Sequence, residues 1–282
     1  MKTPGPIRKD RAEFDVVVIG GGHNGLVCAA YLARAGLKVK VLERRPVVGG
    51  AAVTEEFHPG FRNSTASYTV SLLNPKIIAD LELARHGLKI VERPAMNFLP
   101  LPDGGYLLTG EGRTKAEIAK FSSADAERYD DYCARLAVIA DVLRQLVLQP
   151  PPNVVKGLGL RGLRELGRAA SLANDLRKLD LESQRLLLDL LTMPAADFLS
   201  EWFESGPIKA LLGFDSIVGT YASPYDPGTA YVLLHHAFGE VNGKKGAWGH
   251  ALGGMGAITQ AMAKAAAEHG ADIETEAGVK EV

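Results

Sequence analysis

Three glycines and one glutamate carry the clearest chemistry in this sequence. Gly20, Gly22 and Gly25 follow a valine-rich run with the spacing G-x-G-x-x-G, and Glu43 lies 23 positions after Gly20. In a nucleotide-binding loop, the first glycine permits a tight turn, the second admits a pyrophosphate and the third lets a helix pack closely. A carboxylate at Glu43 would accept hydrogen bonds from ribose hydroxyls and repel a 2′-phosphate, which disfavours NADP.

A strand–helix–strand unit must position these residues. Residues 15–20 form a continuous apolar run that predicts a parallel strand buried on both faces. Residues 24–35 predict a helix, and the alternating residues 38–43 predict a second strand. Near the helix start, His23 and Asn24 are expected to present backbone amides to a phosphate. Because all these elements agree, a glycine-rich turn without a ligand explains the pattern poorly.

A second glycine pair follows the predicted acid. The first loop does not separate FAD from NAD, because both contain an ADP half. Gly49 and Gly50 predict another close backbone approach, beside Ala51, and so favour a longer cofactor such as FAD. Arg44 is suited to a phosphate or to the adenine edge, and a solvated surface arginine explains it equally well. An NAD-dependent dehydrogenase therefore stays an alternative.

The opening of the chain resembles the flavoprotein family that includes phytoene desaturases, carotenoid isomerases and monoamine oxidases. The family pattern is met at Gly20, Gly22, Gly25, Ala29, Leu32, Gly36, Glu43, Gly49 and Gly50. Longer stretches such as "PGFRNSTASYTVSLLNP", "SPYDPGTAYVLLHHAFG" and "GAWGHALGGMGAITQAMA" are similar to the phytoene desaturase-like branch. The resemblance extends over nearly the whole chain from Phe14.

This resemblance implies FAD held by the first glycine loop, with Glu43 on the adenosine ribose. It implies that Gly49, Gly50 and Ala51 line the pyrophosphate and flavin side, and that the backbone of Val279 contacts adenine. The implied activity is hydride transfer to the flavin from an apolar small-molecule substrate, or isomerisation of that substrate. Family members are much longer than this chain. We therefore expect a C-terminally truncated sequence that is inactive alone.

The expected fold is α/β, a Rossmann-like FAD-binding domain with an inserted helical lobe and an incomplete C-terminus. Residues 1–13 are expected to form a disordered arm and 14–89 the first part of the FAD-binding domain. Residues 90–245 are expected to form the inserted, mostly helical substrate lobe. Residues 246–282 return to the FAD-binding domain.

Weaker patterns leave alternatives open. Ser122 to Asp125 predicts a capping box at a helix start, and residues 271–282 predict a strand, a turn and a strand. His235 and His236 are interpreted as strand residues on opposite faces, one packed and one solvated. The stretch "ALGGMGAITQ" is suited to a flavin or an apolar substrate, and a plain helix entry explains it equally well. No catalytic acid or base can be named, so the catalytic residues stay unknown and a non-catalytic flavin-binding regulatory protein stays an alternative.

The amino-acid composition limits the classes of partner that this chain could bind. The 282 residues are 46% hydrophobic and 23% charged with a net charge of −1, which gives no indication of nucleic-acid binding. Cys28 and Cys133 are the only cysteines, so a CxxC redox pair is excluded, and no metal site is expected. These features favour the cytoplasm, or mitochondria in a eukaryote. The basic, leucine-rich segment 156–178 is suited to a peripheral contact with an anionic membrane, although a solvated outer face explains it more simply. The oligomeric state stays unknown.

Overall fold

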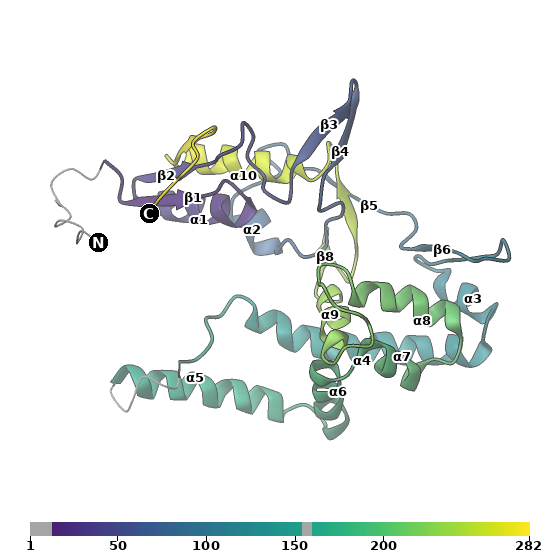
Figure 1. The fold of residues 1–282 in the computed structure, drawn as a ribbon. Helices are drawn as coiled ribbons and strands as arrows, with labels where there is room; N and C mark the ends of the chain where they lie inside the picture. The colour runs from purple at the N-terminus through teal and green to yellow at the C-terminus, as the bar shows by residue number, and fades with distance from the viewer. Residues whose placement is uncertain (1–12, 154–159) are drawn as a thin grey trace. The chain divides into compact units, whose positions relative to one another are not determined.

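The computed structural model describes residues 13–153 and 160–282, which form two compact units. The first unit includes residues up to Glu92, with Glu240–Gly243 and Ala247–Val282. The second comprises Arg93–Gly239 and Lys244–Gly246. Figure 1 traces both units in chain order. Each unit is described by itself.

The first unit is built on a three-stranded parallel sheet in the order β1–β2–β11. Its elements are β1 (Val16–Ile19), α1 (His23–Arg34), β2 (Val39–Leu42), β3 (Thr54–His58), β4 (Phe61–Ser64), α2 (Pro75–Asp80), β5 (Ile90–Glu92), β8 (Glu240–Val241), β10 (Gly249–Ala251), α10 (Gly256–Glu268) and β11 (Asp272–Glu274). The predicted strand–helix–strand unit is confirmed by β1, α1 and β2. Residues 54–64 contain the β3–β4 hairpin.

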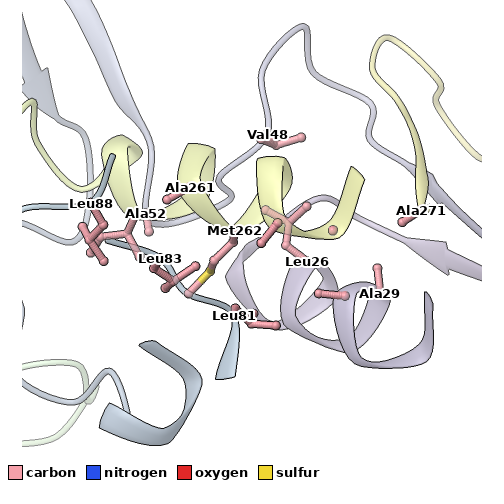
Figure 2. Close-up of a cluster of buried hydrophobic side chains, with 14 of the residues drawn as sticks. Leu26, Ala29, Val48, Ala52, Leu81, Leu83, Leu88, Ala261, Met262 and Ala271 are labelled. Carbon is pink, nitrogen blue, oxygen red and sulfur yellow. The ribbon is translucent and has the colours of Figure 1, made fainter. Parts of the chain in front are cut away.

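The core of this unit lies where α1 and α10 pack on the sheet. Leu26 and Ala29 of α1 meet Met262 of α10 in one buried cluster, which also includes Val39 and Val41 of β2. Figure 2 shows Met262 lying close to Leu83 in the centre of this cluster. The many alanines on α1 and α10 let the two helices approach closely, which fixes the start of α1 relative to the sheet.

The opposite face of the sheet is uncovered in the described part of the chain. Val16 and Val18 pack against the core, but Val17 and Ile19 are 53% and 55% exposed. The prediction that residues 15–20 are buried on both faces is therefore wrong. The physical reason is that α1 and α10 both cover the same face. Among the described strands, β1 pairs with β2 alone, so its other edge is open.

The second unit is mostly helical. Its elements are β6 (Phe98–Pro100), β7 (Tyr106–Leu108), α3 (Thr114–Ala119), α4 (Ser123–Leu146), α5 (Leu160–Arg177), α6 (Leu181–Thr192), α7 (Ala195–Trp202), α8 (Gly206–Gly213), a short 3-10 helix (Phe214–Ser216), α9 (Thr229–His236) and β9 (Lys244–Lys245). Its core contains Tyr132 of α4, whose ring centroid lies 5.0 Å from that of Phe203, and Leu190 of α6.

Three local expectations need correction. His235 and His236 end the helix α9, not a strand, because Gly228 enters the left-handed region and starts a helical turn there. Only half of the predicted capping box forms. Ser122 accepts a hydrogen bond from the Asp125 amide, but the Asp125 carboxylate instead accepts hydrogen bonds from the amides of Glu204 and Ser205. After β11 the chain runs on without the second predicted strand.

The described residues contain neither a membrane-spanning helix nor a metal-binding cluster. No helix there has both the length and the apolar character needed to cross a membrane. Residues 13–153 and 160–282 contain no cluster of histidine, cysteine and acidic side chains arranged to hold a metal ion.

Candidate dinucleotide-binding site

The start of α1 leaves backbone amides without a protein acceptor. Gly22 is the N-cap residue, and no side chain caps the helix. Its carbonyl accepts a hydrogen bond from Leu26, but in the described part of the chain the amides of His23, Asn24 and Gly25 have no acceptor. The side chains of His23 and Asn24 are exposed. Such a helix start attracts an anion through its amides and its dipole.

Two of the three glycines of the motif are required by the protein's own structure. Gly20 has a φ of 97°, a left-handed conformation that favours glycine. A Cβ on Gly25 would lie 2.3 Å from the carbonyl oxygen of Gly20, so the helix could not pack where it does. Both positions are thus fixed by the protein itself, as the motif predicts.

Gly22 differs because nothing in the protein requires a glycine there. Its φ of −72° and ψ of 169° are open to any residue. A Cβ would meet no atom closer than the Cα of Gly50, at 3.9 Å. The space above Gly22 is therefore open, and it adjoins the free amides of α1. A phosphate group fits this cradle, and a side chain at Gly22 would occupy it.

Glu43 is buried beside this cradle and holds the glycine loop in place through hydrogen bonds. Its side chain is 6% exposed at the end of β2. Oε2 accepts a hydrogen bond from the Gly21 amide at 2.7 Å, and Oε1 accepts one from the Arg45 amide at 2.9 Å. Each carboxylate oxygen keeps a further lone pair with which it can accept a ribose hydroxyl. Glu43 is thus suited to two tasks, which are holding the glycine loop and binding a ribose.

The second glycine pair packs directly on the first loop. The Gly49 amide donates to the carbonyl of Gly21 at 2.9 Å, and Gly49 forms an isolated parallel bridge with Gly22. Gly50 has a φ of 57°, and its added Cβ would lie 3.2 Å from the Cα of Gly22. The close approach predicted for a longer cofactor is made in this structure between the two loops. Gly49 and Gly50 alone therefore do not separate FAD from NAD.

Hydroxyl groups hold the second loop against α10. Thr259 Oγ1 donates to the Ala52 carbonyl at 3.0 Å and is fully buried. Thr54 Oγ1 and Ser64 Oγ accept hydrogen bonds from the amides of Gly256 and Met255. The start of α10 is therefore already capped, in contrast to the start of α1. The threonine within "GGMGAITQ" carried no distinctive signal, because Ala52, the loop residue that it contacts, lies 207 positions away.

The glycines of this stretch also have a packing role. A Cβ on Gly254 would lie 2.4 Å from Thr54 Oγ1, and one on Gly256 would lie 2.8 Å from the Thr54 amide. Close contact with β3 accounts for both glycines. This placement agrees with the simpler interpretation of "ALGGMGAITQ" as a helix entry.

The remaining predicted site residues lie at the edge of the candidate site. Arg44 and Ala51 are exposed next to Glu43 and Gly50. The segment after β11 runs along the end of β2, where Ala277 donates its amide to the Glu43 carbonyl at 2.9 Å. Val279 follows two residues later and is 38% exposed. The structure thus brings the glycines and Glu43 together, with Ala277 on the backbone of Glu43. The contact of Val279 with adenine stays a prediction.

Comparison with known proteins agrees with this geometry. Residues 18–79 match the family of NAD(P)-binding Rossmann-like domains. The chain is 43% identical over 284 aligned positions to pyridine nucleotide-disulfide oxidoreductase domain-containing protein 2 of Rattus norvegicus, covering 96% of this chain and 49% of that protein. It is 46% identical over 121 positions to a limonene dehydrogenase component from Castellaniella defragrans, covering 42% of this chain and 22% of that protein. The chain thus spans about half the length of the rat protein.

Solved structures show the same fold. A variant of putrescine oxidase superposes with a TM-score of 0.54 at 18% identity, over 93% of this chain and 50% of that one. The Rossmann-like fold and the resemblance that the motifs predict are confirmed, and a flavin or nicotinamide dinucleotide is the cofactor class that this fold indicates.

Proposed function

We propose that this chain is the cofactor-binding part of an FAD-dependent oxidoreductase of the phytoene desaturase-like type. Its reaction would be hydride transfer to the flavin from an apolar substrate, or isomerisation of such a substrate. The observation that carries the proposal is the cradle at α1. Free amides, an open Gly22 and a buried carboxylate converge there at the end of a parallel strand.

The residues of this chain would hold the cofactor at two points. The amides of His23, Asn24 and Gly25 point their positive ends at a pyrophosphate. Glu43 accepts ribose hydroxyls while it keeps Gly21 in place. Bound FAD would supply an isoalloxazine ring that accepts a hydride, and the protein would contribute orientation and exclusion of water. No acid or base of this chain is assigned a catalytic role.

Support for FAD over NAD comes from similarity, since the loops fit either cofactor. The fold is shared with putrescine oxidase and cyclohexylamine oxidase. Support for an apolar substrate comes from the limonene dehydrogenase component, whose name indicates a terpene hydrocarbon. The disulfide in the rat protein's name finds no support in this sequence, because Cys28 and Cys133 lie 105 positions apart, form no CxxC pair and are both free.

The test is the visible absorbance spectrum of the purified chain, followed by heat release and chromatographic identification of the cofactor. We expect the cofactor that the chain retains to be FAD, in a small amount that is lost in Gly22→Val and unchanged in a control, Leu188→Glu, at an exposed position. Release of NAD would support the dehydrogenase alternative. Bound FAD that no terpene hydrocarbon or amine reduces under anaerobic conditions, in a chain of the relatives' length, would support the regulatory alternative.

A further inference from the structure

Helix α5 has an apolar half and a basic half. At 100° per residue, the apolar residues share one side of the helix. They are Leu163, Leu166, Ala169, Ala170, Leu172, Ala173 and Leu176. The opposite side carries Arg164 and Arg168, and Lys178 follows directly after the helix. Such a distribution is typical of a helix that lies along an interface between an apolar phase and water.

One stripe of the apolar half is exposed within its own unit, whereas Ala169, Leu172 and Leu176 are partly buried. Leu163 and Leu166 are 55% and 42% exposed, and Ala170 and Ala173 continue the same exposed stripe. α5 makes no extensive contact with another described helix or strand of the second unit. Figure 1 shows it apart from α7, α8 and α9 of that unit.

An unsupported helix of this composition would be marginal in water. Gly162 and Gly167 lie within it and lower its intrinsic stability. Helices of this length gain most of their stability from packing an amphipathic face on another surface. The apolar half of α5 therefore needs a surface to cover it.

The charges of α5 indicate which surface that is. Glu165 accepts the Asn153 amide at 3.1 Å and pairs with Arg168 at 3.2 Å, so this acid is engaged locally. Arg164 and Arg177 are exposed, and among the described side chains neither forms a salt bridge, although the charge of Arg164 acts on the neighbouring Glu165. An excess of positive charge beside a shallow leucine and alanine face complements an anionic surface over an apolar interior.

We propose that α5 binds the surface of an anionic lipid bilayer, with its leucine stripe at the boundary between headgroups and acyl chains. Arg164 and Arg168 extend toward the lipid phosphates, because arginine side chains are long enough to reach the headgroups from the far side of a shallow helix. This places the second unit at a membrane without a transmembrane segment. The inference is independent of the cofactor that the first unit binds.

The test is co-sedimentation of the full 282-residue chain with lipid vesicles. The vesicles are phosphatidylcholine alone, or phosphatidylcholine with roughly one third phosphatidylglycerol. We expect binding to the anionic vesicles only. The binding should weaken between about 0.1 M and about 1 M salt, as the Debye length falls from about 10 Å to about 3 Å. The double variant Leu163→Glu/Leu166→Glu should bind about ten-fold more weakly or worse, and so should Arg164→Gln/Arg168→Gln.

Matched controls come from α6 of the same unit. Leu188 is 60% exposed, and Arg185 is exposed and lies 3.7 Å from Asp189. Leu188→Glu and Arg185→Gln should bind vesicles as the wild type does, and circular dichroism should show that all variants are folded. Equal binding to neutral vesicles, no binding to either vesicle, or equal losses in the α6 controls would overturn the proposal. So would loss of a dimer in the Leu163→Glu/Leu166→Glu variant without vesicles, which would identify a second copy as the covering surface.

Discussion

At the scale of single residues, the glycines of the first loop should separate folding from binding. A Cβ at Gly22 meets open space, whereas one at Gly25 lies 2.3 Å from a backbone oxygen. We expect Gly22→Val to keep the far-UV circular dichroism and thermal midpoint of the wild type while it loses the cofactor. Gly25→Val should unfold or aggregate, because α1 could no longer pack on the strand. Flavin fluorescence and circular dichroism measured on both variants check this, and tight flavin binding by Gly22→Val would refute the cradle.

Glu43 gives a graded prediction at the same scale. Glu43→Gln keeps one good acceptor but turns an amide nitrogen toward one of the two N–H groups that the carboxylate now accepts. Loss of one charged hydrogen bond should weaken FAD binding by about 1.5–3 kcal/mol. Glu43→Arg loses both acceptors and adds bulk in a buried position, so it should weaken FAD binding further. Fluorescence titration with FAD measures both constants, and equal affinity in the three proteins would contradict a ribose-binding role.

The sequence was sufficient for residues whose role depends on near neighbours. Gly20, Gly22, Gly25 and Glu43 lie in one strand–helix–strand unit, where spacing alone places them. The sequence was insufficient where distant segments meet. Thr259 bonds to Ala52, and that contact exists only after the chain has made its long excursion through the second unit.

At the scale of elements, Thr259 connects α10 to the second glycine loop. Thr259→Val keeps the shape of the side chain but leaves the Ala52 carbonyl without its buried partner. We expect a loss of about 1–3 kcal/mol in stability, with weaker cofactor binding, because Gly49 packs against both the loop and Thr259. Thr259→Ser restores the hydroxyl and should recover cofactor affinity. Unchanged affinity in Thr259→Val, or no recovery in Thr259→Ser, would show that this contact does not position the loop.

Asp125 has the equivalent role in the second unit, with a pH dependence. It is fully buried and accepts the amides of Glu204 and Ser205 at 2.8 Å each, which fixes the turn between α7 and α8. Burial pushes the pKa of Asp125 up, but the hydrogen bonds from Ser205 and Glu204 outweigh it and hold that pKa below its ordinary value. A lowered pKa in the folded state gives stability above the unfolded pKa of about 3.9 that is lost as pH falls.

Asp125→Asn should therefore be less stable than the wild type at neutral pH by about 1.5–3 kcal/mol. The difference should begin to shrink below about pH 4, where the carboxyl is protonated in the unfolded chain, and it should be lost only as the pH falls through the lower pKa of the folded protein. Urea unfolding followed by circular dichroism measures it, with Asp130→Asn, an exposed carboxylate on the same helix, as the control. If the stability difference between Asp125→Asn and the wild type is the same at neutral pH and well below pH 4, the effect comes from packing rather than from charge.

Element types were predicted well where the pattern is local, and poorly where tertiary context decides. The helix ending before Gly36 is an example of the first, since Gly36 has a φ of 88° at the expected position. The valine run of β1 is an example of the second. Its composition indicates two buried faces, whereas only one is covered in the described structure. A sequence pattern shows what a strand could bury, but it does not show which elements are present to bury it.

At the scale of the whole molecule, that uncovered sheet should govern how the 282-residue chain behaves. Val17 and Ile19 are more than half exposed, and the outer edge of β1 pairs with no described strand. An exposed apolar face beside an open strand edge promotes self-association. We therefore expect the chain to be poorly soluble, to retain little flavin and to show no turnover.

Substitutions at Val17 and Ile19 test whether this exposed face causes self-association. Val17→Thr/Ile19→Thr keeps the β-branched shape that favours a strand but makes the face polar. This variant should show a higher monomer fraction in size-exclusion chromatography. Leu181→Thr, which alters an 82% exposed leucine in the second unit, should not. If the wild-type chain is already a stable monomer with stoichiometric FAD that a substrate reduces, the exposed face does not cause self-association. The sheet of β1, β2 and β11 would then be sufficient to hold a working cofactor.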